Sequence, residues 1–346
     1  MIDQNLIFRV LCAVGLFFLV QVMFFWSKLG NLDDTKLTIE AEIEMLTRKR
    51  NGLQMKTWEL EKDIHRLQLR LNQIEAQVHE RIPLLQNHSN LSTIYFITPT
   101  YNRPARKADL TRLAQTLAHV PSILWIIVED AEEISPAVAM IARQNGVPFV
   151  HLCAITPPKL KLNDTDPSWK LPKGVNQRNT ALAWLRKNYG SHRSGVVYFG
   201  DDDNTYDLRL FEEIRATKQL GVWPVGLVGG LLVETPLVEN GKVIGFNAVW
   251  KPKRPFPIDM AAFAVSLDLV NKMPDVVFSY DVPRGFQESH FLTSLGLQYV
   301  NATPMARNCS KVYVWHTRTE MPKLEKNERG KMTLKQLNDL ERDAVG

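Results

Sequence analysis

The feature that most limits the fold of this chain is the alternation of short β-branched runs with helical stretches beyond residue 93. Strands are expected at 94–98, 124–128, 147–152 and 196–199, and helices at 107–118, 135–144 and 175–189. Such alternation is typical of α/β proteins in which helices cover a mostly parallel sheet. The later stretch 225–315 is richer in glycine, proline and aromatic residues, and it predicts mixed sheet and loops.

One strand of this series, 196–199, ends next to the aspartate triplet, Asp201, Asp202 and Asp203. Ligands of open α/β sheets bind outside the carboxyl ends of the strands, so the triplet lies where a site is expected. Neighbouring carboxylates are costly there unless a cation offsets their charge. A hard divalent ion that also binds substrate phosphates would do so.

Two other interpretations of the triplet remain open from the local sequence. Glu212 stands at the twelfth position from Asp201, as in an EF-hand loop, but Tyr206 replaces the required glycine and a strand comes before it. The second interpretation is a solvated turn that caps a helix near Asp207.

Other polar residues follow the neighbouring predicted strands. Tyr101 and Arg103 come after the first strand, where a ring could stack on a base and a guanidinium could meet phosphate. Asp130 follows the second strand, and Arg178 lies where a helix begins at 174–179. The sequence contains neither G-x-G-x-x-G after the first strand nor a P-loop motif, so phosphate must be bound in another way.

The N-terminal part of the chain reads differently from the rest. After a short tail, 1–9, an apolar run at 10–26 is bounded by Arg9 and Lys28 and predicts a short transmembrane anchor. A cleaved signal peptide is the alternative, but no small-x-small cleavage pattern lies near the end of the run. The two flanking charges nearly balance, so they do not decide the orientation.

The predicted stem, 27–92, contains a heptad pattern at 39–78. This periodicity is typical of a coiled coil, and it predicts a parallel dimer. A single amphipathic helix that lies on the catalytic domain is the alternative. Pro83 is expected to end the helix, with a polar linker at 86–92.

Charge and cysteine content exclude some classes of protein. The formal charge of +5 and the pI near 9.0 suit an anionic partner, but the basic residues are spread among acids, which disfavours a nucleic-acid partner. Cys12, Cys153 and Cys309 form neither a disulfide framework nor a CxxC metal site. Candidate glycosylation sequons, usable only in the secretory lumen, lie at Asn87, Asn90, Asn163, Asn301 and Asn308.

From residue 94 to about 320, several long motifs occur together: TPTYNRP, VEDAE, QRN, VVYFGDDDNTY, WPVGLVGG, RPFPIDMAAFAV, QES and NCSKVYVWHTRTE. In this order they resemble the β-1,3-glucuronyltransferase family of Golgi enzymes. The resemblance implies a GT-A type nucleotide-sugar domain, with a UDP-binding half at 93–200, an acceptor-binding half at 201–320 and a charged tail at 321–346. It also implies a single-pass type II Golgi membrane protein with a lumenal catalytic domain that forms a homodimer.

The resemblance assigns a role to each matching residue. Asp203 would bind Mn²⁺, and Glu288 would be the catalytic base of an inverting transfer. The residues implied to bind the nucleotide sugar are Tyr101, Asp130, Lys173, Arg178, Asp201, Asp202, Arg284, His316 and Arg318. Those implied to bind the acceptor sugar are Glu234, Arg254 and Asp259.

Three departures limit this transfer of roles. Lys173 stands where the family usually has arginine, which keeps the charge but loses the planar fork. Gly200 replaces the usual alanine before the triplet, a change expected to be harmless. The segment 321–326 lacks the glutamine with which family members can reach across the dimer.

These observations predict transfer of glucuronic acid from UDP-glucuronic acid to O3 of a terminal galactose, with Gal-β1,3-Gal of the proteoglycan linker as the leading acceptor. Within the family, Trp250, 174–179 and 283–285 look more like the enzymes that act on Gal-β1,3-Gal than like those that act on Gal-β1,4-GlcNAc. A catalytically idle, membrane-tethered glycan-binding protein is the alternative from another class.

Overall fold

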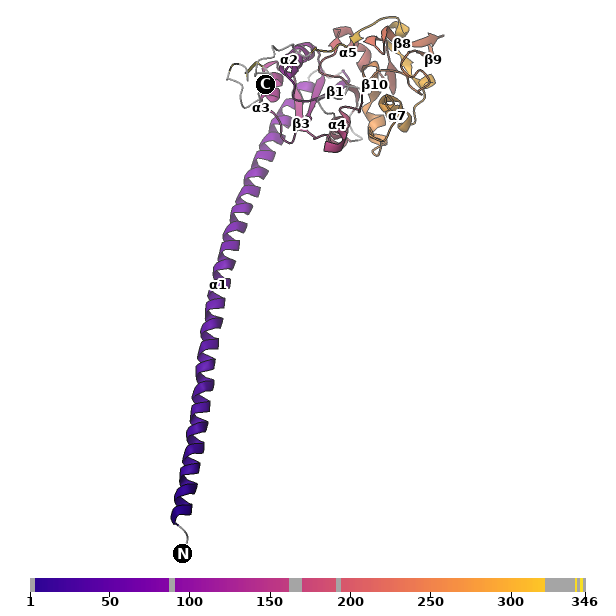
Figure 1. Ribbon diagram of the computed structural model, residues 1–346. Helices are drawn as coiled ribbons and strands as arrows, with labels where there is room; N and C mark the ends of the chain where they lie inside the picture. Colours follow the sequence, from indigo (N-terminus) through magenta and orange to yellow (C-terminus); the bar gives the residue numbers. More distant parts are fainter. Residues whose placement is uncertain are drawn as a thin grey trace, which may run out of the picture. The chain divides into compact units, whose positions relative to one another are not determined.

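The computed structural model describes residues 4–86, 91–161, 170–190, 194–320, 340 and 343–344. The chain divides into two compact units, residues 1–77 and 78–346. Figure 1 shows the first as one long helix and the second as a packed assembly of strands and helices. Each unit is described below by itself.

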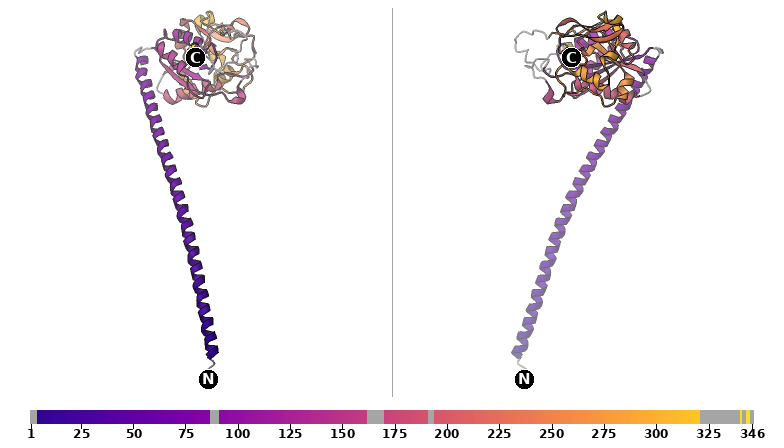
Figure 2. Two further views of the ribbon diagram at one scale, coloured as in Figure 1. Left: turned by 60° about the vertical axis from the view of Figure 1, so that its left-hand side comes forward. Right: turned by 90° about the vertical axis from the view of Figure 1, so that its right-hand side faces the viewer.

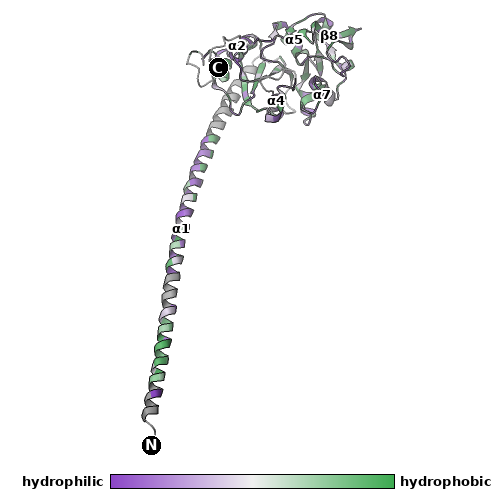
Figure 3. Ribbon diagram, in the orientation of Figure 1, coloured by the Kyte–Doolittle hydropathy of each residue, from purple (hydrophilic) through white to green (hydrophobic). Residues whose placement is uncertain are grey.

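The first unit consists of helix α1, Gln4–Gln86, which continues a short way into the second unit, and both views in Figure 2 show it as continuous. Apolar residues gather towards its N-terminal part (Figure 3), and large apolar side chains along it are exposed. In the part of the chain that the structure describes, no helix has the length and apolar character of a membrane span.

The prediction that Pro83 ends the helix was wrong, because α1 continues to Gln86. A proline removes one backbone donor and crowds the preceding turn. In so long a helix this loss interrupts one hydrogen bond without stopping the helical path.

The second unit is built on a seven-stranded sheet with the order β11-β6-β10-β4-β1-β2-β3. Its strands are β1 Thr93–Thr100, β2 Ile123–Glu129, β3 Phe149–Cys153, β4 Gly195–Phe199, β6 Leu220–Val222, β10 Phe263–Ser266 and β11 Thr303–Pro304. Strands β1 to β4 are parallel, and β10 pairs antiparallel with both β4 and β6. This arrangement confirms the predicted α/β fold with a mostly parallel sheet.

A second sheet has the order β5-β12-β7-β8-β9. Its strands are β5 Thr205–Tyr206, β7 Val225–Val228, β8 Leu231–Glu239, β9 Lys242–Asn247 and β12 Val314–Trp315. Strand β5 begins just after the aspartate triplet, and β12 pairs with it from far along the chain. The second sheet therefore brings the residues after Trp315 to the carboxyl end of β4.

Helices cover the larger sheet because its central strands are apolar on both faces. Every residue of β2 and β4 is buried. Helix α4 packs on β1, β2 and β3, and α5 packs on β1 and β4. The helices of this unit are α2 Arg106–Leu117, α3 Pro136–Gln144, α4 Val175–Asn188, α5 Leu208–Arg215, α6 Leu267–Lys272, α7 Gln287–Ser294 and α8 Met305–Cys309. Single 3₁₀ turns lie at Pro158–Leu160, Met260–Ala262 and Tyr299–Asn301.

The predicted element boundaries are close to the observed ones, with one shift at β3. The sequence predicts a strand from residue 147, but β3 begins at Phe149. Pro148 has no amide hydrogen to donate to a strand ladder. Its carbonyl accepts from the Trp125 amide at 2.9 Å, and ladder pairing starts one residue later.

Candidate active site

The aspartate triplet lies at the carboxyl end of β4, beside the ends of β1 and β2, as the sequence predicts. The EF-hand interpretation was wrong, because Thr205–Tyr206 forms a strand and Glu212 lies within α5. The capping-turn interpretation was also wrong for the triplet itself. Asp207 alone caps α5, by accepting from the Arg209 amide at 2.9 Å.

Gly200, just before the triplet, lies against the buried ring of Phe96. A Cβ at residue 200 would approach the Phe96 ring to 2.1 Å. Phe96 is itself packed among Tyr198, Tyr206 and Phe211. Glycine at 200 therefore fits this chain, because the Phe96 ring occupies the space that an alanine methyl group would need.

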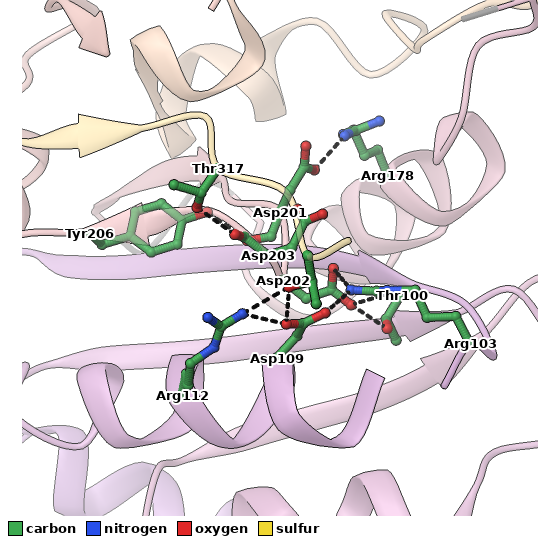
Figure 4. A network of polar contacts seen from close by, with 11 residues as sticks. Thr100, Arg103, Asp109, Arg112, Arg178, Asp201, Asp202, Asp203, Tyr206 and Thr317 are labelled. Atoms are coloured by element: carbon green, nitrogen blue, oxygen red, sulfur yellow. Dashed lines mark hydrogen bonds and ion pairs between the residues drawn. The ribbon is translucent and has the colours of Figure 1, made fainter. Parts of the chain in front are cut away.

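Asp202 is the buried member of the triplet, and its oxygens are both occupied (Figure 4). Arg103 donates to Oδ1 at 2.8 Å and to Oδ2 at 2.9 Å, and the Thr100 hydroxyl donates to Oδ2 at 2.6 Å. Burial raises the pKa of Asp202 above its ordinary value in spite of these bonds. Arg103, which the sequence suggested could meet phosphate, pairs with this carboxylate in the structure.

Asp201 pairs with Arg178 at the beginning of α4. Arg178 Nη2 lies 2.9 Å from Asp201 Oδ1, and its Nη1 donates to the Lys173 carbonyl at 2.8 Å. Gly174 precedes the helix with a φ of +73°, and a Cβ there would meet the Arg178 guanidinium at 2.6 Å. Glycine at 174 thus lets the guanidinium fold back to the triplet.

Asp203 differs from its two neighbours. Among the described residues, no hydrogen bond or ion pair ends on its carboxylate, although its carbonyl accepts from the Thr317 hydroxyl at 2.6 Å. Burial, with Asp202 and Asp201 nearby, raises the pKa of Asp203 to about 6. A carboxylate held in such a negative environment without a partner fits a cation site.

The described residues contain no group of three or more His, Cys, Asp or Glu that could hold a metal ion. A site built on Asp203 therefore offers few protein ligands. That is the usual pattern for a hard divalent ion, which keeps waters and takes oxygen ligands from substrate phosphates.

Tyr101 and Asp130, which the resemblance implies to bind the nucleotide sugar, lie in different environments. Tyr101 is 45% exposed, with Arg103 at 5.0 Å and Lys173 at 5.4 Å from its ring centre. Its open face suits stacking on a base. Asp130 accepts from both the amide and the hydroxyl of Thr156, at 2.7 and 2.8 Å. Burial, with Arg103 and Arg318 nearby, lowers the pKa of Lys173.

Beyond the triplet, a cleft of about 530 Å³ is lined by residues 227–230 and 316–318. His316 Nδ1 lies 3.1 Å from Asp259 Oδ2, and the Arg318 guanidinium lies 3.4 Å from His316 Nε2. Hydrogen bonding to Asp259 raises the pKa of His316 to about 9, so the imidazole is cationic at neutral pH. Burial alone would raise the pKa of Asp259, but the pairing with His316 holds it below its ordinary value.

Glu288 lies in the first turn of α7, beside other carboxylates. Its Oε2 is 3.7 Å from Arg254 Nη1, and its side chain is only 15% exposed. Burial, reinforced by Asp259, raises the pKa of Glu288 to about 7. Burial, with Asp259 and Glu288, also raises the pKa of Glu234 to about 7. Near neutrality, a carboxyl group with such a pKa can take up a proton, which is the property required of a general base.

Arg254 is held by the backbone of two loops. It donates to the carbonyls of Trp250 at 3.2 Å and Lys251 at 3.3 Å, and to the Gly285 carbonyl. The Arg284 guanidinium lies over the Trp250 ring at 4.5 Å from its centre. The segments 250–254 and 284–285 therefore pack against each other beside Glu288.

The structure thus brings together the predicted site residues from separate elements, and it adds several that sequence analysis missed. Asp109, Arg112, Thr317 and Thr319 join the triplet through hydrogen bonds. Thr317 and Thr319 lie beside His316 and Arg318 in the sequence, but no other sequence pattern points to these four residues.

Among the candidate glycosylation residues, Asn301 and Asn308 are exposed, whereas Asn87, Asn90 and Asn163 lie outside the described residues. The predicted tail, 321–346, lies almost wholly outside them as well.

Comparison with known proteins places this site in a family. The model of glycosyltransferase family 43 matches residues 113–320. The chain is 50% identical over 342 residues to galactosylgalactosylxylosylprotein 3-beta-glucuronosyltransferase sqv-8 of Caenorhabditis elegans, covering 98% of this chain and 96% of the relative. It is 46% identical to galactosylgalactosylxylosylprotein 3-beta-glucuronosyltransferase 3 of Homo sapiens, covering 75% of this chain and 81% of that protein.

The chain is also 50% identical to galactosylgalactosylxylosylprotein 3-beta-glucuronosyltransferase I of Drosophila melanogaster. This match covers 69% of this chain and 79% of that protein. The resemblance stated from the motifs is confirmed by these matches. The chain belongs to glycosyltransferase family 43.

Proposed function

We propose that this protein transfers glucuronic acid from UDP-glucuronic acid to O3 of the terminal galactose of Gal-β1,3-Gal, with inversion at the anomeric carbon. The observation that carries the proposal is Glu288, whose pKa is raised to about 7 beside the predicted acceptor residues Arg254, Glu234 and Asp259. The names of the relatives agree with this substrate class.

In the proposed reaction, Glu288 removes the proton from the acceptor O3 as the bond from O3 to C1 of the glucuronate forms. The bond from C1 to the diphosphate oxygen breaks on the opposite face, and UDP leaves. Arg254 stabilises the ionised form of Glu288, so the base is available at neutral pH. The cationic imidazole of His316 would bind the diphosphate as its charge grows.

Donor binding is assigned to the strand ends. Tyr101 would stack on the uracil, while Asp201 and Arg178 would orient the nucleoside together with Asp130 and Lys173. Arg284 and Arg318 would contact the glucuronate carboxylate or the diphosphate, as guanidinium groups suit these anions. Asp202 has both oxygens bonded to Arg103 and Thr100, so its contribution to donor binding would run through Arg103.

Mn²⁺ is the proposed cofactor, held by Asp203. When bound, it would neutralise the diphosphate and make it a better leaving group. The support is the unpartnered carboxylate of Asp203, among the described contacts, and its pKa of about 6. Calorimetry of UDP binding with and without Mn²⁺ tests this assignment, since equal affinity in both would exclude the metal.

The acceptor is tested with the recombinant catalytic part, residues 84–346, UDP-glucuronic acid and a panel of disaccharides. Faster transfer to Gal-β1,3-Gal than to Gal-β1,4-GlcNAc is expected. The opposite preference would contradict the linker assignment. Absence of UDP release with every acceptor would instead favour a glycan-binding protein without catalysis.

We also propose that the enzyme is a single-pass type II Golgi membrane protein and a homodimer. The proposal rests on exposed apolar side chains of α1, such as Phe17, Phe24 and Leu60, which an isolated helix would leave in water. Carbonate extraction from cells tests membrane insertion. Sedimentation of residues 27–346 against 84–346 tests the dimer, which should be lost or weakened in the shorter protein if the helices pair.

A further inference from the structure

Asp109 is a buried carboxylate that the assigned roles leave unexplained. It lies in the first turn of α2 and is 0% exposed. A buried carboxylate is costly unless several donors satisfy it. Asp109 has donors from the loop before α2, from α2 itself and from the segment after β12, so it connects these parts of the chain.

The first donor is Arg103, which Asp109 shares with the triplet. Arg103 Nη2 lies 2.7 Å from Asp109 Oδ2 and 2.8 Å from Asp202 Oδ1, while Nη1 bonds Asp202 Oδ2 at 2.9 Å. Figure 4 shows the guanidinium between the two carboxylates. Because Arg103 is planar and its fork is rigid, two acceptors determine its orientation more closely than Asp202 alone would.

The second donor comes from the segment after β12. The Thr319 hydroxyl donates to Asp109 Oδ1 at 2.6 Å, and Thr317, two residues earlier, donates to the Asp203 carbonyl at 2.6 Å. The two hydroxyls, one residue before and one residue after Arg318, therefore tie this segment to the triplet and to Asp109.

The third donor is Arg112, one turn further along α2. It donates to Asp109 Oδ1 and also to the Thr319 hydroxyl at 3.0 Å. Asp109, Arg112 and Thr319 thus form a closed set of contacts between α2 and the segment that carries His316 and Arg318. Among the described residues, the Thr319 hydroxyl makes its hydrogen bonds with Arg112 and Asp109.

We propose that Asp109 is a positioning residue for the donor site: it holds the segment 316–319 and the Arg103 guanidinium against the aspartate triplet. The proposal rests on the proposed function, because it takes that site to bind UDP-glucuronic acid. Asp109 touches neither substrate, and it acts through Arg103 and Thr319. Its loss should impair donor binding far more than acceptor binding.

The test compares Asp109→Asn, Thr319→Val and the double variant in the full-length protein. Asp109→Asn should raise the KM for UDP-glucuronic acid about tenfold and weaken UDP binding similarly, the scale seen for residues that orient ligating groups. The acceptor KM should stay within about twofold. Since Thr319 acts through Asp109, the double variant should be no weaker in donor binding than Asp109→Asn alone.

Glu213→Gln is the matched control. Glu213 is a half-buried carboxylate on α5 that accepts from the Ala306 amide at 2.9 Å, away from the triplet. Glu213→Gln should leave the KM values for donor and acceptor unchanged. When it is combined with Asp109→Asn, the effects of the two substitutions should be additive. Equal changes in donor and acceptor KM for Asp109→Asn, or an unchanged donor KM, would overturn the proposal.

Two further outcomes remain decisive. If Asp109→Asn does not fold, Thr319→Val alone must still raise the donor KM, and an unchanged value would overturn the proposal. If the wild-type protein binds UDP but transfers no glucuronic acid, the proposed function fails. The positioning role is then judged by UDP affinity in the same variants.

Discussion

Replacing Glu288 by glutamine should change activity and stability in opposite directions. The substitution keeps the size of the side chain but removes the group that ionises. As a general base, Glu288 would contribute about 10²- to 10⁴-fold to the rate, so turnover should fall by that factor while UDP binding is retained. The same group is destabilising when ionised, because it is largely buried beside other carboxylates.

The size of the stability effect follows from the pKa of Glu288. Its ordinary value is 4.5, and burial raises it to about 7 in the folded protein. Between these values the folded state binds more protons than the unfolded state, so the stability contributed by this group is complete below pH 4.5 and is lost as the pH rises through about 7. A displacement of this size corresponds to about 3 kcal/mol. The glutamine of the variant does not ionise and avoids the loss.

Thermal unfolding of the wild type and Glu288→Gln between pH 5 and 8.5 measures this difference. The Tm of the variant should rise relative to that of the wild type as the pH rises. Above pH 7.5 the difference in Tm should stay constant at roughly 6 °C. The kcat/KM of the wild type should fall below about pH 7 as the base becomes protonated. A Tm gap that does not depend on pH, together with retained turnover in the variant, would refute the assignment of Glu288 as a buried base.

The remaining predictions concern the donor side and the core. Asp203→Ala should abolish Mn²⁺-dependent UDP binding, measured by calorimetry, with at least a roughly tenfold loss of affinity; unchanged binding would remove Asp203 as the metal ligand. Turnover should fall above about pH 9 as His316 loses its proton, because its pKa is raised to about 9, and His316→Gln should remove that alkaline limb of the pH profile. Gly200→Ala should cost about 1–3 kcal/mol of unfolding free energy by overpacking against Phe96, whereas an unchanged urea midpoint would show that the ring can move freely.

The sequence alone predicted the fold class and the sheet edge at which the aspartate triplet lies. The strands β1, β2 and β4 are apolar runs bounded by polar residues, and that pattern depends on local sequence. Because parallel strands end at one edge of a sheet, Tyr101, Asp130 and the triplet could be placed together without coordinates. The motifs then identified the family, which the comparisons confirm.

Local sequence could not decide what each side chain faces. Arg103 appeared to be a phosphate ligand, yet Asp202 and Asp109 occupy it. The local sequence also did not show that glycine is needed at 200, because the Phe96 ring that fills the space beside it comes from another strand. The contacts of Arg103 with Asp202 and of Gly200 with Phe96 each join residues about a hundred positions apart, and no periodicity in the chain predicts them.

The triplet and the alternation of elements were therefore determined by the sequence itself, since both follow from short stretches of residues. The tertiary structure decided that Glu288, which only the family resemblance had singled out, stands beside Arg254 and Asp259, and that burial raises its pKa to about 7. The physical reason is that the ionisation of a carboxyl group depends on the water it loses and on the charges around it, and both are set only when distant segments pack together.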